Sequence, residues 1–144
     1  MIVKQPGSKM CFVCGRENPF GLHAEFLIED DKVVVEFTPE ERHQSYPGVM
    51  HGGLVSTLLD ETIGRSAFLL NKWVVTAKME LRYRQPVPIG QPIRVVGWTT
   101  RQRGRLLEAQ GEVRLADGSV AVEAKGLFVE MPEERRQEVE SLVF

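Results

Sequence analysis

The sequence predicts an α+β domain in which one long helix packs against an antiparallel sheet. Segments with the pattern of strands lie on both sides of residues 53–70, whereas within 53–70 the apolar residues recur with the spacing of a helix. A sheet of this size curls, and a helix that is apolar around much of its circumference fits inside the curl. The 144 residues suit a single domain over 1–144 with a core of its own.

Two strands are expected before the helix, after an N-terminal arm over residues 1–21. The arm ends in an Asn-Pro-Phe-Gly turn signal. Residues 22–28 alternate loosely between apolar and polar types, and residues 33–37 are short and β-branched. Together they predict a hairpin. Residues 40–50 contain a Pro-Gly pair and are expected to form a loop.

The helix is predicted over residues 53–70. One stripe of it is formed by Val55, Leu59, Ile63, Ser66 and Leu70. Leu58, Thr62 and Leu69 flank that stripe. The other side carries Thr57, Asp60, Glu61 and Gly64. Because small residues surround Asp60, the pattern leaves room for a ligand to approach its carboxylate.

Four further strands are expected after the helix, and the chain then ends in a charged tail. The predicted strands cover residues 73–83, 93–102, 106–115 and 120–130. Asp117-Gly118 is a strong signal for a tight hairpin between the last two. Residues 132–144 have a weak apolar period and are expected to form a short tail helix.

The composition favours an ordinary globular protein. Hydrophobic residues make up 42% and charged residues 26% of the chain. A formal net charge of -2 argues against a dedicated nucleic-acid-binding protein. No apolar run reaches the roughly 18 residues that would span a membrane, and the N-terminus lacks a signal-peptide core. A cytoplasmic location is therefore expected, without nucleic-acid or membrane partners.

The only two cysteines, Cys11 and Cys14, are three residues apart. The pair resembles half of a zinc knuckle, but no second pair follows it. His23 and His43, or a second chain, are the sources that could complete a metal site. A buried structural turn is the preferred interpretation, ahead of metal binding or redox chemistry.

The start of the helix combines two features that suit acyl-transfer chemistry. Gly52 and Gly53 let the backbone approach a ligand closely, and the first helical turn offers unpaired N–H groups to a developing oxyanion. Asp60 follows about two turns later. The spacing therefore predicts that Asp60 acts on a group bound at the helix start.

The segment from His51 to Asp60 resembles the hotdog-fold acyl-CoA thioesterases of the phenylacetate-degradation type, which are related to 4-hydroxybenzoyl-CoA thioesterase. The preceding residues 43–50 and the arm motif Cys-x-x-Cys-Gly-x-x-Asn-Pro-x-Gly-Leu strengthen the resemblance, which extends from about residue 11 to 131. It implies a hotdog fold, in which a curved sheet wraps around a central helix. It also implies a homodimer, or a dimer of dimers (homotetramer), with active sites at the dimer interface and no metal or redox cofactor.

The resemblance assigns roles to individual residues in thioester hydrolysis. Asp60 is expected to be the general base or the nucleophile, and Gly53, with Gly52 beside it, the oxyanion donor. Thr76 is expected to hold the attacking water. His51 either contacts the substrate or, as slightly favoured, holds the loop. The alternative without a catalytic role is that Asp60 is an ordinary helix aspartate whose carboxylate is hydrogen-bonded by a neighbouring Ser or Thr. This alternative is disfavoured because burying the charge of the carboxylate is costly.

Other residues are expected to contact the substrate. Arg103 and Arg105, at a hairpin tip, are the preferred coenzyme A phosphate contacts among the strand arginines. Some relatives carry Asn where this chain has Ser45, so Gln44 or His43 is the alternative contact to the thioester carbonyl. Gly48 and Glu61 complete the expected set, although an ordinary pair with Arg65 is the better interpretation of Glu61.

Two other functions remain open at the level of sequence. A hotdog dehydratase or hydratase would use a histidine and a carboxylate as paired acid and base, and only His51 lies near. A non-catalytic acyl-CoA-binding module is the third alternative. Hydrolysis of acyl-CoA to free acid and CoA is the prediction.

Overall fold

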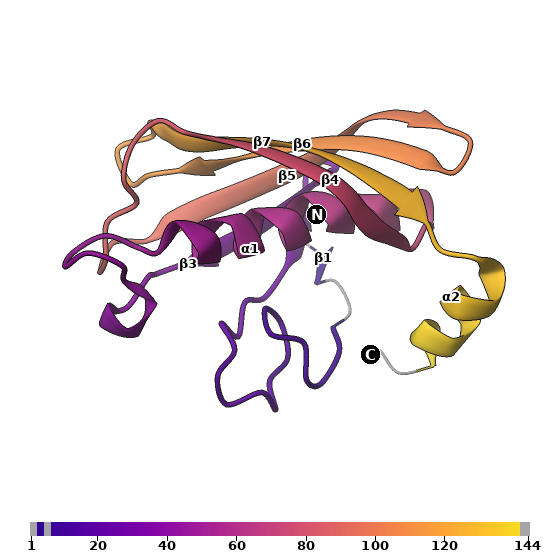
Figure 1. The fold of residues 1–144 in the computed structure, drawn as a ribbon, viewed down its shortest axis with the longest axis horizontal. Coiled ribbons are helices and arrows are strands. Elements are labelled where there is room, and N and C mark those ends of the chain that lie inside the picture. Colours follow the sequence, from indigo (N-terminus) through magenta and orange to yellow (C-terminus); the bar gives the residue numbers. More distant parts are fainter. Residues whose placement is uncertain (1–2, 5–6, 142–144) are drawn as a thin grey trace.

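An arched antiparallel sheet covers one long helix in the computed structural model, which describes residues 3–4 and 7–141 (Figure 1). The strand order is β1-β2-β3-β5-β6-β7-β4. The strands are β1 (Val3–Lys4), β2 (Leu27–Glu29), β3 (Lys32–Phe37), β4 (Val74–Tyr83), β5 (Ile93–Arg103), β6 (Leu106–Arg114) and β7 (Val120–Glu130). The helices are α1 (Gly52–Gly64) and α2 (Glu133–Glu140), with 3₁₀ turns at Glu41–His43 and Arg65–Leu70. This confirms the predicted α+β class.

The helix α1 lies unusually close to the sheet. On α1, Leu58, Leu59 and Ile63 form an apolar stripe that is fully buried. Gly97 on β5 faces this stripe, and a Cβ atom at Gly97 would lie 2.9 Å from the Ile63 Cα atom. A Cβ atom at Gly111 on β6 would lie 2.4 Å from the Ile63 side chain. The absence of a side chain at these two positions therefore allows the helix backbone to approach the sheet.

Several predicted boundaries are wrong. Of the predicted strand over 22–28, only residues 27 and 28 lie in a strand, which is β2; the chain bends earlier at His23, whose φ of 55° is left-handed. The predicted helix over 53–70 becomes a 3₁₀ helix after Gly64 and ends at Asn71, whose φ is 56°. Leu70, placed on the buried stripe, is 42% exposed.

The two ends of the chain differ in part from the prediction. The arm contains a short strand, β1, which pairs with β2 and adds a seventh strand to the sheet. The tail helix is confirmed as α2, which projects beyond the sheet (Figure 1). Residues 1–2 and 5–6 of the predicted arm and 142–144 of the predicted tail lie outside the described residues.

Strand β4 forms an edge of the sheet. It pairs with β7 alone, and across residues 3–4 and 7–141 no strand pairs with its other side. The pairing slips between Thr76 and Lys78, so a bulge lies beside the Thr76 side chain. Helices long and apolar enough to cross a membrane are absent from the described residues.

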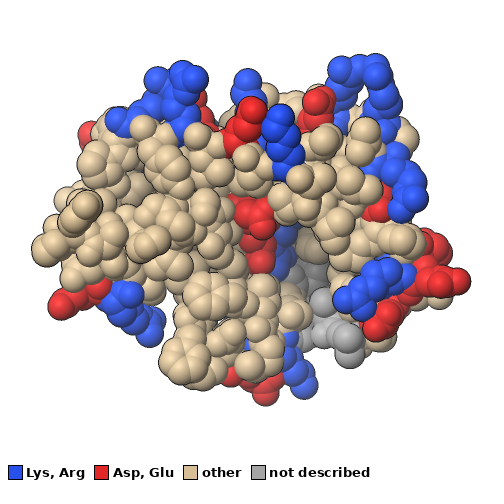
Figure 2. Space-filling model, viewed as in Figure 1, with Lys and Arg blue, Asp and Glu red and all other residues tan. Residues whose placement is uncertain are grey.

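The face that carries α1 is mainly uncharged. In Figure 2 the lysine and arginine side chains lie mostly around the margin of this face, and acidic side chains gather near its middle. The face therefore presents carboxylates within largely uncharged surroundings.

Candidate functional site

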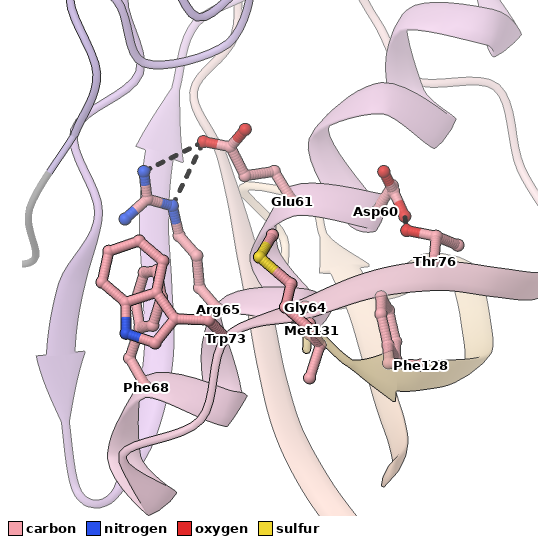
Figure 3. Close-up of a pocket in the computed structure, with 10 residues that line it drawn as sticks. Asp60, Glu61, Gly64, Arg65, Phe68, Trp73, Thr76, Phe128 and Met131 are labelled. Carbon is pink, nitrogen blue, oxygen red and sulfur yellow. Dashed lines mark hydrogen bonds and ion pairs between the residues drawn. The ribbon is translucent and has the colours of Figure 1, made fainter. Parts of the chain in front are cut away.

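A cavity of about 240 Å³ opens beside the second half of α1 (Figure 3). We call it the Asp60 pocket. It is lined by Asp60, Glu61, Gly64, Arg65, Phe68, Trp73, Val74, Thr76, Phe128 and Met131. Two adjacent carboxylates and one guanidinium group thus share a pocket whose remaining walls are largely apolar.

Asp60 is held by a hydrogen bond from the neighbouring strand. The Thr76 hydroxyl on β4 donates to the Asp60 carboxylate, with 2.6 Å between Oγ1 and Oδ1. Ser56 and Thr57, the helix residues that could have satisfied Asp60, instead donate to the Gly53 carbonyl oxygen at 2.7 and 2.9 Å. The Thr76 contact fixes one carboxylate oxygen, so the other is available to a molecule in the pocket.

Glu61 is engaged differently from Asp60, although the two are adjacent. Arg65 donates to its carboxylate at 3.1 Å, as the i,i+4 spacing predicts. The guanidinium group of Arg65 stacks on the ring of Phe26, 4.3 Å from its centroid. Burial raises the pKa of Glu61 to about 7, and the positive charge of Arg65 opposes part of that rise.

The two cysteines contact this ion pair. The Cys11 thiol donates to the Glu61 carboxylate at 3.2 Å, and Arg65 donates to the Cys14 sulfur at 3.1 Å. Both cysteines are free and partly buried. Cys11, Cys14 and Glu61 each present one metal-ligand atom within 4.8 Å of the others. However, Arg65 already supplies a positive charge to two of these three groups, which disfavours a metal cation beside them.

The start of α1 forms a second site at the other end of the helix. His51 caps the helix, because its Nδ1 atom accepts a hydrogen bond from the Gly53 N–H at 2.9 Å. Tyr83 at the end of β4 donates to the Gly52 carbonyl oxygen at 2.7 Å. This hydrogen bond is of the structural kind that was favoured for His51. The Gly53 N–H, expected to be the oxyanion donor, is already occupied, whereas no acceptor within the described chain bonds the Gly52 N–H.

A shallow pocket lies at this helix start, and we call it the Gly52 pocket. It is lined by Ser45, Val49, Met50, Gly52, Val55, Tyr83, Arg84, Gln85, Pro86 and Val87. The two pockets share no lining residue. Eight residues of helix place Gly52 about 12 Å from Asp60 along the axis. Within one chain, this separation is too long for direct contact between Asp60 and a group bound at the Gly52 N–H.

The loop residues expected to contact substrate lie at the Gly52 end. Ser45 lines the Gly52 pocket, and the Gln44 side chain accepts a hydrogen bond from the Gly48 N–H at 3.2 Å. Gly48 is exposed and adopts a φ of 85°. His43, offered as an alternative contact, is 5% exposed and accepts from the Glu40 N–H, so it faces the interior.

The arginines expected to contact phosphate lie at the tip of the β5–β6 hairpin. Arg103 is exposed, and Arg105 donates to the Glu130 carbonyl oxygen at 2.9 Å. Because Met131, the next residue, lines the Asp60 pocket, Arg105 lies at the same end of the sheet as that pocket.

Sequence reasoning missed the roles of Tyr83 and of the two cysteines. Tyr83 stands 31 residues from the carbonyl that it contacts, and Cys14 stands 51 residues from Arg65. No local pattern reports such contacts. The only available signal was the placement of Tyr83 at the end of a strand that also carries Thr76.

Comparison with known proteins agrees with this architecture. The family model of the thioesterase superfamily matches residues 47–122. An acyl-coenzyme A thioesterase of Xenopus laevis, THEM4, is 30% identical over 69% of this chain and 46% of its own length. A putative esterase of Saccharolobus solfataricus is 28% identical over 69% of this chain and 71% of its own length. The chain thus spans only about half of the THEM4 protein.

Solved structures show the same fold. A thioesterase superfamily protein with 32% sequence identity superposes with a TM-score of 0.80 over 84% of this chain and 60% of its own. The PaaI protein of the E. coli phenylacetic acid degradation operon has 13% identity and a TM-score of 0.71, over 77% of this chain and 81% of its own. With the family model covering more than half of its residues, this chain belongs to the thioesterase superfamily and has a hotdog fold.

Proposed function

We propose that the protein hydrolyses acyl-CoA thioesters to a free acid and coenzyme A, with Asp60 as the general base. The observation that carries this proposal is the hydrogen bond from Thr76 to Asp60 inside a pocket with largely apolar walls. A carboxylate fixed through one oxygen can use its other oxygen to remove a proton from water. The chemistry needs no metal ion or redox cofactor.

The oxyanion donor is proposed to come from a second copy of the chain. Among the described residues no strand covers the outer edge of β4, and a symmetric partner can extend this edge by antiparallel pairing. Thr76 and Tyr83 lie equally far from the midpoint between Met79 and Glu80. A twofold axis at that midpoint therefore sets the Thr76 end of one β4 beside the Tyr83 end of the other. Since Tyr83 holds Gly52, the partner's helix start would complete the Asp60 pocket.

The proposed reaction follows from this arrangement. Thr76 and Asp60 hold a water molecule, and Asp60 takes a proton as the water oxygen attacks the thioester carbon. The carbonyl oxygen gains negative charge, which the Gly52 N–H and the positive end of the α1 dipole stabilise. Collapse of the tetrahedral intermediate breaks the C–S bond and expels coenzyme A as a thiolate, which then takes up the proton. Direct attack by Asp60 is the nucleophilic variant of this scheme.

Related proteins support the choice of substrate and of residues. THEM4 is an acyl-coenzyme A thioesterase, and a Streptococcus mutans protein of this fold was solved with acetyl-CoA bound. A Streptococcus pneumoniae thioesterase protein was solved with coenzyme A. Alanine variants of that protein at an aspartate and at a threonine sixteen residues later were also solved. Asp60 and Thr76 have the same separation.

The test is the isosteric substitution Asp60→Asn, assayed by thiol release from a panel of acyl-CoA substrates. A positioned base contributes about 10²- to 10⁴-fold to a rate, so kcat is expected to fall by at least about 100-fold. Binding of acyl-CoA should remain near wild type, because the amide keeps the shape of the carboxylate and the glycine backbone is untouched.

Glu61→Gln is the matched control, because it changes the adjacent carboxylate in the same way. It should reduce kcat less than about tenfold, since Glu61 is engaged by Arg65 rather than by Thr76. Loss of activity in Glu61→Gln but not in folded Asp60→Asn would transfer the basic role to Glu61. Absence of thiol release from every acyl-CoA by the wild-type protein would overturn hydrolysis and leave the binding-module alternative.

A further inference from the structure

The two thiols of the arm are arranged for a reaction with each other. They are the only cysteines of the chain, and their sulfur atoms lie within 4.8 Å of one another. The turn that carries them is closed by a hydrogen bond from the Gly15 N–H to the Cys11 carbonyl oxygen at 2.8 Å. A Cβ at Gly15 would meet the Cys11 backbone at 2.5 Å, so the tight turn depends on glycine.

The surroundings make the two thiols chemically unequal. Cys14 receives a hydrogen bond from the buried guanidinium group of Arg65, whereas Cys11 donates to the carboxylate of Glu61. Hydrogen bonding between the thiols lowers the pKa of Cys14 to about 7 and raises that of Cys11 to about 12. Cys14 is therefore the more readily ionised thiol and the nucleophile of the pair, and Cys11 retains its proton.

The site suits this chemistry better than it suits a metal ion. Arg65 is only 8% exposed and lies 3.1 Å from both the Cys14 sulfur and the Glu61 carboxylate. A divalent cation bound by the two thiols and Glu61 would have to displace this guanidinium group from its stack on Phe26. Unequal thiols beside a fixed cation are instead typical of a dithiol that reacts as a nucleophile and a resolving partner.

We propose that Cys11 and Cys14 form a reversible dithiol–disulfide pair that reacts with hydroperoxides. The Cys14 thiolate attacks the distal oxygen of hydrogen peroxide, the O–O bond breaks, and a sulfenic acid and, after protonation of the leaving hydroxide, water result; an organic hydroperoxide would release its alcohol in place of this water. Glu61 accepts the proton of Cys11, whose sulfur attacks the Cys14 sulfur and expels the hydroxyl group as a second water. Both sulfurs are oxidised by one peroxide, which is reduced, and an external thiol reverses the reaction.

The pair is coupled to the Asp60 pocket through two shared residues. Glu61 and Arg65 contact the thiols on one side and line the pocket on the other. A disulfide removes the thiol proton that Glu61 accepts and the thiolate that Arg65 faces. Oxidation therefore changes the wall of the pocket beside Asp60, without altering Asp60 or Thr76.

The test treats the reduced protein with one equivalent of hydrogen peroxide and measures its intact mass. The expected product has lost two hydrogens, remains a single chain on a non-reducing gel, and regains its mass with dithiothreitol. Because mass is the readout, this result is independent of thioesterase activity. A mass unchanged at concentrations that oxidise free cysteine, or a disulfide joining two chains, would overturn the proposal.

Two serine variants distinguish the roles of the thiols. With hydrogen peroxide, Cys11→Ser should gain one oxygen, and dimedone should trap it as a sulfenic acid. With iodoacetamide at pH 7, Cys14→Ser should react at least about tenfold more slowly than Cys11→Ser. In the wild-type chain, fragmentation of the peptide 10–16 should place the first alkylation on Cys14. Equal labelling of both thiols, or one stoichiometric zinc ion in the protein as isolated, would overturn the assignment.

Discussion

Gly52 and Gly53 are adjacent glycines with different environments. The N–H of Gly53 donates a hydrogen bond to the capping residue His51, while the N–H of Gly52 bonds no acceptor in the described chain. The second glycine therefore serves the helix, and the first is the one that can serve a ligand. Because Nδ1 of His51 accepts this hydrogen bond, the ring N–H lies on Nε2.

The conformation of the helix start allows the Gly52 donor to be removed on its own. Proline lacks an N–H and is tolerated at the first position of a helix. The preceding residue, His51, has a ψ of 128°, which proline permits. Gly52→Pro should therefore fold with α1 intact, as checked by circular dichroism, and lower kcat by about 10²- to 10³-fold.

Gly52→Ala is the control for this substitution. It keeps the N–H, and its Cβ would lie 3.6 Å from the Tyr83 ring, an ordinary contact. Its kcat should stay near that of the wild type. If Gly52→Pro retained full activity in a folded protein, the oxyanion donor would lie elsewhere, and Gly53 would again be the first candidate.

The order of residue types along the chain predicted some residues of this site but not the hydrogen bonds between them. Asp60, Thr76 and the glycine pair could be named from their spacing and from a family resemblance, and Thr76 does contact Asp60. The occupation of Gly53 could not be foreseen, because it depends on how the His51 ring turns. The contacts of Tyr83 and Cys14 depend on packing between segments far apart in the sequence.

At the scale of elements, the approach of α1 to the sheet sets the position of the site. Strand and helix types were predicted correctly where a period is sustained, as in 120–130 and most of α1. They failed at residues 22–28 and 65–70, where single left-handed residues, His23 and Asn71, reverse the chain. Asn and His adopt the left-handed region more often than other non-glycine residues, but residue type alone does not say which of them do so in a given chain.

The close approach of helix and sheet yields a stability prediction. Gly97→Ala places a methyl group 2.9 Å from the backbone of Ile63, and neither backbone can move without separating α1 from β5. The substitution should lower the free energy of unfolding by about 1–3 kcal/mol in chemical denaturation. Gln102→Ala, an exposed position on the same strand, should change it by less than about 0.5 kcal/mol. Equal stability of Gly97→Ala and wild type would show that the helix is not tightly seated.

At the scale of the whole molecule, one chain is an incomplete catalyst under the proposed function. The carboxylate and the free N–H lie at opposite ends of α1, in pockets that share no residue. Residues 76 and 83 of β4 are about 23 Å apart in an extended strand, so pairing of two β4 edges can bring unlike ends together at two places. We therefore expect a dimer in sedimentation, with twice the chain mass of 16.3 kDa.

The separation of the two groups along α1 also has a genetic consequence, which is complementation between two defective alleles. In a mixed dimer of Asp60→Asn and Gly52→Pro chains, one site receives both intact groups and the other receives neither. Random pairing of equal amounts makes half the dimers mixed, so co-expression of the two inactive variants should restore about a quarter of the wild-type sites. Sedimentation should show dimers in each sample. No recovery in a mixture shown to contain mixed dimers would mean that each chain works alone.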